Sequence, residues 1–325
     1  MDPQITSIQP GGGVVIKLEL AWGRLRRRYL KTFRPRYVER MRQLRRGDVN
    51  GCPHEVLDSR DLKFYRNQPG YYWEPADDRF RWRDRLPFAR DGLAELFVFM
   101  ALTFLPAAGL AWLIVSSELG GFVEVFGWLV VATLTIVGAL IVWFFRDPNR
   151  VVPTGQAVVV SPADGTVAAI EEIEHDDFIG GPAVMIGIFL SIFNVHINRM
   201  PIAARVIGLR YKKGKYLNAL RPESARENEQ LAVRIEGSDP PHHRMIVRQI
   251  AGAIARRIVC AIKPGDELDA GARFGMIKLG SRTELVMPRE PGLLIKVEIG
   301  QKVRAGATVM AEFAPKLERS AKGTR

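Results

Sequence analysis

The sequence predicts a β-dominated (α+β) soluble domain with barrel-sandwich and hammerhead-like elements, preceded by a two-helix transmembrane hairpin. Two observations lead to this prediction. Two uncharged apolar runs occupy the middle of the 325-residue chain, and after Pro153 the pattern changes to short β-branched runs separated by Gly, Pro and Asp. We therefore expect a basic N-terminal extension over residues 1–90, the hairpin over 91–146 and the soluble domain over 147–325.

The hairpin is predicted from Leu96–Val115 and Val125–Phe145, which contain no charged residue. A helix of about 20 residues spans the hydrocarbon core of a bilayer. Neither run has the polar stripe of a surface helix, although two buried core helices of a soluble protein would share this pattern. Pro106 is tolerated within such a span. Tryptophans, which favour the membrane interface, lie towards the ends of the runs, at Trp112, Trp128 and Trp143.

The charge pattern predicts the orientation of the hairpin and the partner of the N-terminal extension. The formal net charge is +12, and Arg24–Arg46 holds eleven Lys or Arg against one acid, Glu39. Basic flanks and a lightly acidic connector place both ends in the cytoplasm, at the inner membrane. Nucleic acid is one anionic partner for the basic segment, but the hairpin favours membrane lipid. Apolar residues interleaved there would help it lie on the surface, namely Leu25, Tyr29, Leu30, Phe33 and Tyr37.

Cysteine usage indicates neither a disulfide framework nor a metal site. Cys52 and Cys260 lie far apart and lack metal-ligand spacing. The N-terminus has no basic segment followed by an apolar core, so it is not expected to be a signal peptide.

The soluble domain is expected to contain about a dozen strands, with a helix only near Arg221–Gln230. The segments SPADGTVAAI and PREPGLLIKVEIGQKVRAGATVM each place a Gly in a turn before a strand, which is typical of a small sandwich of hammerhead-like sheets. Biotinyl and lipoyl carriers use similar turns. They also need an exposed Lys in a short hairpin, and the absence of such a Lys argues against a carrier.

Three polar residues interrupt the strand pattern of this domain. Asp164 precedes a Gly, His196 lies among strand-forming residues, and Ser281 follows Gly280. Each has an ordinary structural interpretation, as a turn residue or a buried histidine. Together they supply the components of an activated nucleophile. Sequence alone leaves both interpretations open.

Several motifs resemble one known family. FRDPNRVVP, VSPADGTV, FLSIFNVHINRMP, KGKYLNA, ENEQ and FGMIKLGSRTEL follow one another between about Phe145 and Phe313. In this order they resemble the phosphatidylserine decarboxylase family, most closely its short bacterial type. The Gly-Ser pair alone would be a weak signal, whereas the ordered set is specific.

The resemblance implies a self-processing, membrane-anchored enzyme that converts phosphatidylserine to phosphatidylethanolamine and CO2 through a pyruvoyl Schiff base. Cleavage between Gly280 and Ser281 would turn Ser281 into the pyruvoyl group, with no metal and no pyridoxal phosphate. Asp164 and His196 would assist the serine, and His196 would return a proton to the substrate Cα. Chains 1–280 and 281–325 would stay associated, and the family is compatible with a homodimer.

One position departs from the family pattern. Longer members carry a second histidine where this chain has Arg199, so His196 is expected to serve both steps, or Arg199 to bind the substrate carboxylate or phosphate. Phosphate contacts are a further interpretation for three lysines that otherwise form a solvated loop, Lys212, Lys213 and Lys215.

Two other functions stay open at this level. One is a membrane-anchored β-domain without catalysis, in which Arg24–Arg46 binds lipid or nucleic acid. The other is a pyruvoyl decarboxylase for a different amino-acid-headgroup lipid, such as an ether-linked analogue.

Overall fold

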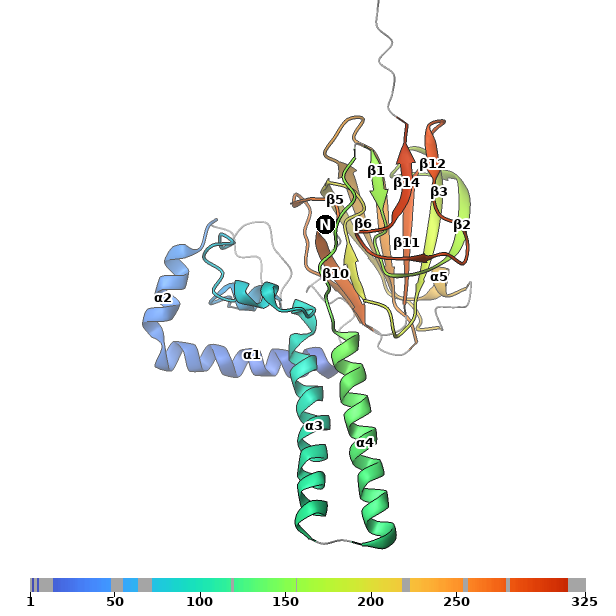
Figure 1. The fold of residues 1–325 in the computed structure, drawn as a ribbon. Helices are drawn as coiled ribbons and strands as arrows, with labels where there is room; N and C mark the ends of the chain where they lie inside the picture. Colours follow the sequence, from blue (N-terminus) through green and yellow to red (C-terminus); the bar gives the residue numbers. More distant parts are fainter. Residues whose placement is uncertain are drawn as a thin grey trace, which may run out of the picture.

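The computed structural model describes residues 2, 5, 14–47, 55–63, 72–117, 120–155, 157–217, 223–253, 257–278 and 281–314. A β-rich domain stands on a long helical hairpin, and two further helices lie beside the junction (Figure 1). The predicted fold class is confirmed.

The hairpin consists of α3 (Leu93–Ser116) and α4 (Gly121–Phe144). Both helices are long and apolar enough to cross a membrane, and most of their side chains are not buried against protein. They pack closely where glycine leaves room: a Cβ on Gly138 would lie 2.8 Å from Thr103 Oγ1. Small residues at such contacts are typical of helix pairs in membranes. The two helices therefore indicate membrane association.

The open end of the hairpin is joined to the β-rich domain. The Ala89 amide donates to the Phe145 carbonyl at 2.8 Å, which links the segment before α3 to the residue after α4. Phe144 and Phe145 belong to a buried cluster that includes Val195 and Ile197 of the β-rich domain. The end of α4 therefore packs directly beside His196.

The N-terminal extension contains α1 (Val14–Phe33), α2 (Pro35–Leu44) and short 3-10 helices at Ser59–Lys63, Arg81–Arg85 and Arg90–Gly92. Buried aspartates hold α1, because Arg26 pairs with Asp58 and Asp61. The chain start reaches the β-rich domain, where the Tyr211 amide donates to Asp2 Oδ2 at 2.7 Å. The extension therefore packs against the rest of the chain, and the boundary at residue 90 stays a prediction.

Three antiparallel sheets make up the β-rich domain. The largest has the order β13 (Lys302–Val303), β2 (Gly165–Asp176), β3 (Gly181–Leu190), β11 (Ser281–Pro288), β7 (Arg244–Ile250), β6 (Gln230–Gly237), β5 (Ala204–Lys212) and β9 (Glu267–Leu268). The second has the order β1 (Val158–Val160), β14 (Val309–Phe313) and β12 (Leu293–Ile295). The third has the order β4 (Ile197–Arg199), β10 (Arg273–Lys278) and β8 (Arg257–Cys260).

Strand β11 lies at the centre of the largest sheet, and all eight of its residues are buried. It pairs with β3 from Ser281 opposite Leu190 to Pro288 opposite Ala183, and with β7 on its other edge. A strand buried on both faces is usually apolar throughout. The first four residues here are Ser, Arg, Thr and Glu, so their polar groups need specific partners.

Two local features refine the expectations from sequence. The helix expected over Arg221–Gln230 is the short α5 (Ser224–Glu227), because Gln230 already begins β6. The expected tight turn in GQKVRAG is present, and its glycines take the left-handed conformation with φ of 90° at Gly300 and 69° at Gly306. Glycine adopts such angles readily because it has no Cβ.

Candidate active site

Three motifs that are distant in sequence meet around one side chain, that of Asn198. Its Nδ2 donates to the Pro162 carbonyl at 3.3 Å and to Thr283 Oγ1 at 3.0 Å. Pro162 begins the PADG turn, Asn198 follows His196 by two residues, and Thr283 follows Ser281 by two residues. The fold therefore brings together the segments that carry the predicted Asp164, His196 and Ser281.

Ser281 is the first residue of β11 and is fully buried. Its Oγ has no hydrogen-bond partner within the described ranges. Leaving a buried hydroxyl unsatisfied costs roughly 1–3 kcal/mol, which makes Ser281 a candidate for a functional role. Gly280, the other half of the predicted cleavage site, lies outside the described residues.

His196 is 1% exposed, and its ring lies 4.6 Å from that of Phe144, centroid to centroid. Nδ1 is 2.9 Å from the Asn194 carbonyl, which only accepts, so Nδ1 carries the proton and Nε2 carries a lone pair. Nε2 is also buried without a partner in the described part of the chain. Burial lowers the pKa of His196 to about 4, the Asn194 bond opposes this, and the charge of Arg146 adds to the lowering. His196 is therefore a neutral base at physiological pH.

Asp164 is buried, and both of its carboxylate oxygens have partners. Oδ2 accepts from Arg150 Nη2 at 2.7 Å, and Oδ1 accepts from the Ala305 amide at 2.7 Å. Burial raises the pKa of Asp164, and these two hydrogen bonds and the charges of Arg150 and Arg146 oppose the rise. The partner of His196 Nδ1 is the Asn194 carbonyl and not Asp164, so the site lacks the carboxylate–imidazole contact of a serine-protease triad. A role for Asp164 in processing stays a prediction.

Arg199 is 6% exposed and uses its guanidinium within the fold. Nη1 donates to the Gly271 carbonyl at 3.0 Å, and Nη2 pairs with Asp147 Oδ1 at 2.9 Å. Asp147 belongs to the FRDPNRVVP motif, so Arg199 joins that motif to the end of β4. These contacts favour a structural role, and substrate binding by Arg199 stays a prediction. The lysine loop lies at the surface, where Lys215 pairs with Glu227 at 2.7 Å.

A buried network around Asn198 was missed by sequence analysis. Gln249 Nε2 donates to Asn198 Oδ1 at 2.9 Å and to the Val259 carbonyl at 3.3 Å. Asn198, Gln249 and Thr283 are all fully buried. The available signal was the polar central residue of two strand segments, Gln249 in RQI and Thr283 in RTE. Asn198 ends the segment HIN and had no such signal.

A second missed cluster joins the strand before Ser281 to the helical hairpin. Lys278, the last residue of β10, pairs with Glu95 in the first turn of α3. Arg257 of β8 pairs with the same carboxylate at 2.7 Å and with Glu19 of α1 at 3.4 Å. The partners are far apart in sequence, so no local pattern reveals them.

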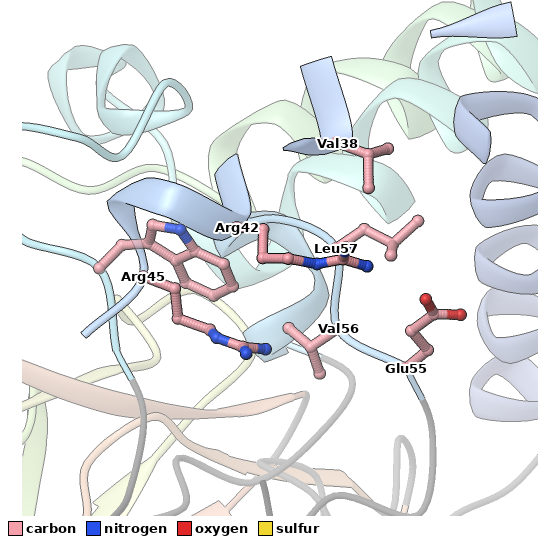
Figure 2. Close-up of a pocket in the computed structure, with 7 residues that line it drawn as sticks. Val38, Arg42, Arg45, Glu55, Val56 and Leu57 are labelled. Atoms are coloured by element: carbon pink, nitrogen blue, oxygen red, sulfur yellow. The ribbon is translucent and has the colours of Figure 1, made fainter. Parts of the chain in front are cut away.

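Within the described ranges, no group of three or more His, Cys, Asp or Glu is arranged to hold a metal ion. Cys260 is buried in β8, and Cys52 lies outside the described residues. Figure 2 shows a small pocket in the N-terminal extension, and it contains none of the predicted site residues. Its lining residues are Val38, Arg42, Arg45, Glu55, Val56, Leu57 and Trp73.

Comparison with known proteins gives one consistent family. The model of the phosphatidylserine decarboxylase family matches residues 137–311. A phosphatidylserine decarboxylase proenzyme of Rhodopirellula baltica is 48% identical over 252 residues, 78% of this chain and 99% of that protein. A proenzyme of the same name from Nitrosomonas eutropha is 42% identical over 58% of this chain and 84% of that protein. Another from Desulfotalea psychrophila is 36% identical over 70% of this chain and 98% of that protein. The 252-residue match necessarily includes both apolar helices.

Proposed function

We propose that this chain, which belongs to the phosphatidylserine decarboxylase family, cuts itself between Gly280 and Ser281 and uses the resulting pyruvoyl group to decarboxylate phosphatidylserine. The family assigns the enzyme class, a decarboxylase made as a proenzyme. One observation supports the self-processing step most directly. A buried hydroxyl and a buried neutral imidazole, Ser281 Oγ and His196 Nε2, lie in adjoining segments and both lack partners among the described residues.

In the proposed maturation, His196 Nε2 takes the proton of Ser281 Oγ, and the oxygen attacks the Gly280 carbonyl carbon. The Gly280–Ser281 amide bond breaks as the ester forms, and the proton on His196 Nε2 passes to the Ser281 nitrogen, which becomes a free amine. Loss of the Ser281 Cα proton then breaks the Cβ–Oγ bond, leaving a carboxylate on Gly280 and dehydroalanine at position 281. One water hydrolyses its imine tautomer, releasing ammonia and leaving the ketone.

The residues of the site fit this group. The Ser281 position is buried, and the unpartnered Nε2 of His196 belongs to a segment that is hydrogen-bonded to that strand. The pyruvoyl group supplies an electrophilic ketone that condenses with the substrate amine and withdraws electrons from Cα as CO2 leaves. His196 Nε2, after taking a proton from the substrate ammonium group, would return it to Cα. Closure of the site by buried strands keeps competing water away from that carbon.

The two products of cleavage are expected to stay together. Residues 281–288 form β11, which is hydrogen-bonded to β3 on one edge and to β7 on the other. Strands β12, β13 and β14 of the short chain pair within the short chain and with β1 and β2 of the long chain. Cutting one peptide bond leaves all of this pairing in place, so the short chain remains a central part of the core.

We also propose that the hairpin spans the membrane with α1 lying on the cytoplasmic surface. Figure 1 shows α1 crossing the hairpin near the end that meets the β-rich domain. One face of α1 exposes an apolar stripe at helical spacing, Leu18, Trp22, Leu25, Tyr29 and Phe33. Two residues that were expected on this apolar surface point into the protein instead. Leu30 is buried, and the Tyr37 hydroxyl donates to Asp58 at 2.9 Å.

The proposed function is tested by following CO2 release from carboxyl-labelled phosphatidylserine, using the purified protein in lipid nanodiscs. We expect CO2 release that phenylhydrazine abolishes, because this reagent blocks ketones. An ether-linked phosphatidylserine analogue, assayed in parallel, tests the alternative substrate. An intact chain without CO2 release from either lipid would contradict the proposal and favour a binding module.

The pKa of His196 predicts an unusual pH profile for self-cleavage. An ordinary histidine loses its basic form as pH falls through about 6.5. Because the pKa of His196 is about 4, its Nε2 lone pair persists over a further pH range on the acid side. We expect the cleavage rate of freshly refolded precursor to be nearly constant from pH 8 to pH 5.5 (about threefold change or less) and to fall as pH approaches about 4. A midpoint near 6.5 would contradict this assignment.

The Asn198 network predicts a positioning effect on self-cleavage. In Asn198→Leu the donor to Thr283 and Pro162 is lost, and buried polar groups are left unpaired. We expect cleavage to slow by about 10- to 100-fold, since a small misplacement of reacting groups has effects of this size. Thr283→Ser keeps the acceptor and should cleave normally, whereas Thr283→Val should resemble Asn198→Leu. Melting temperatures separate this effect from loss of folding.

A further inference from the structure

We propose that the turn Ser191–Asn194 inserts Ile192 and Phe193 into the bilayer beside the end of α4, and so holds the His196 side of the site against the lipid headgroups. The inference rests on the proposed function, because the lipid there is taken to be the substrate. The turn would then mark the surface through which a membrane lipid reaches the buried site.

The turn is built to present these two side chains outward. Asn194 Oδ1 accepts from the Ser191 amide at 2.9 Å and from Ser191 Oγ at 2.7 Å, and the Asn194 amide donates to the Ser191 carbonyl at 3.0 Å. Ile192 and Phe193 occupy the two central positions and are 45% and 59% exposed. A single exposed apolar residue is ordinary, but an adjacent pair on a braced turn indicates a contact surface.

The turn is attached to the end of a membrane-spanning helix. Arg146 Nη2 donates to the Phe193 carbonyl at 2.8 Å, and Nη1 donates to the Trp143 carbonyl at 2.7 Å. The guanidinium also lies 4.1 Å from the centre of the Trp143 ring, which is 54% exposed. Trp and Arg at a helix end mark the headgroup region of a bilayer. Ile192 and Phe193 therefore lie at the depth where apolar side chains enter lipid.

The same turn holds the proposed base. The Asn194 carbonyl accepts the proton of His196 Nδ1, and Val195 packs in the cluster that contains Phe144 and Phe145. The Arg146 charge acts on both His196 and Asp164, so this cation lies close to the site. A lipid phosphate at headgroup level would therefore lie near the positive charge of Arg146, beside His196. Turn, helix end and site histidine form one connected unit.

The bilayer is the occupant that these observations favour. The exposed pair continues the apolar surface of α4 past its final turn, and the neighbouring charge is positive, as anionic headgroups require. Apolar side chains at comparable exposure occur elsewhere in the β-rich domain, at Leu294 (55%) and Ile299 (66%). These two residues supply matched controls.

The direct test measures depth in the membrane. A fluorophore is attached to Phe193→Cys, or to Leu294→Cys as the control, with Cys52 and Cys260 replaced, in vesicles of phosphatidylglycerol and phosphatidylethanolamine. We expect spin labels near the headgroup to quench the probe at 193 strongly and the probe at 294 weakly. Equal quenching at the two positions would overturn the proposal. A probe at 193 that reports an apolar environment without lipid quenching would show that protein covers the turn, and this would also overturn it.

A second test measures use of the bilayer substrate. Turnover is measured for long-chain phosphatidylserine in vesicles and for dihexanoyl phosphatidylserine dissolved in water. The ratio of the first rate to the second should fall at least about tenfold in Ile192→Ser/Phe193→Ser. The ratio should be unchanged in Leu294→Ser/Ile299→Ser. An unchanged ratio in the first variant would overturn the proposal. If the wild type releases no CO2, the proposed function fails, whereas the quenching result still decides whether the turn enters the membrane.

Discussion

Replacing Ser281 by alanine should leave the protein as a single 36.5 kDa chain, whereas the wild type should separate into residues 1–280 and a pyruvoyl-modified chain 281–325. Alanine lacks the oxygen that must attack the Gly280 carbonyl, so no ester can form. The variant should also release no CO2 from phosphatidylserine, because the ketone is never made. Intact mass under denaturing conditions measures both outcomes.

The matched control is Ser224→Ala. Ser224 is equally buried but lies in α5. We expect this variant to cut itself as the wild type does, apart from any modest loss of stability. A wild type that remains whole, or a Ser281→Ala protein that is still cut at the same bond, would remove the basis for the proposed cofactor.

His196→Gln should slow self-cleavage by at least about 100-fold, which is the usual contribution of a positioned base. Glutamine keeps a polar side chain of similar size, but its amide is not a base at neutral pH. The Ser281 hydroxyl is still present in this variant, but it would have to react without His196 to accept its proton. Time courses of precursor cleavage, followed by intact mass, measure the effect. His175→Gln, at a histidine near the end of β2 whose side chain is 62% exposed, should cleave at the wild-type rate.

The same variant tests whether one histidine serves both steps. Molecules of His196→Gln that do mature carry the ketone, so their turnover per pyruvoyl group isolates the second role. We expect turnover to fall as well, because the neighbouring buried carboxylates are already paired with arginines, Glu284 with Arg248 and Arg282, and Asp164 with Arg150. Normal turnover by matured His196→Gln would restrict His196 to maturation and assign the returning proton to another group. Normal cleavage by the variant would contradict its role as the base.

Much of the architecture was predictable because its causes are local. The two uncharged runs predicted α3 and α4, since length and apolarity alone decide whether a helix suits a bilayer. Short β-branched runs predicted a β-rich domain, and the turn glycines predicted its tight corners. The ordered motifs identified the family, which the comparisons confirmed. The helix near Arg221 was predicted too long, because pairing of Gln230 in the largest sheet overrides local helix signals.

Only the tertiary structure decided how the site residues are partnered. Asp164, His196 and Ser281 were named from sequence, but the Asn194 carbonyl holds the imidazole, and Arg199 pairs with Asp147 inside the fold. Asn198 and Lys278 had no distinguishing local pattern, because their partners are contributed by other strands and by the hairpin.

The sequence by itself therefore determined which segments are apolar enough to cross a membrane, which region forms strands and which family the ordered motifs indicate. The fold decided which buried polar groups have hydrogen-bond partners and which have none among the described residues. The physical reason is that apolar length and turn preference depend on neighbours in the chain. Hydrogen bonding and the pKa of a buried group depend instead on atoms that only folding brings together.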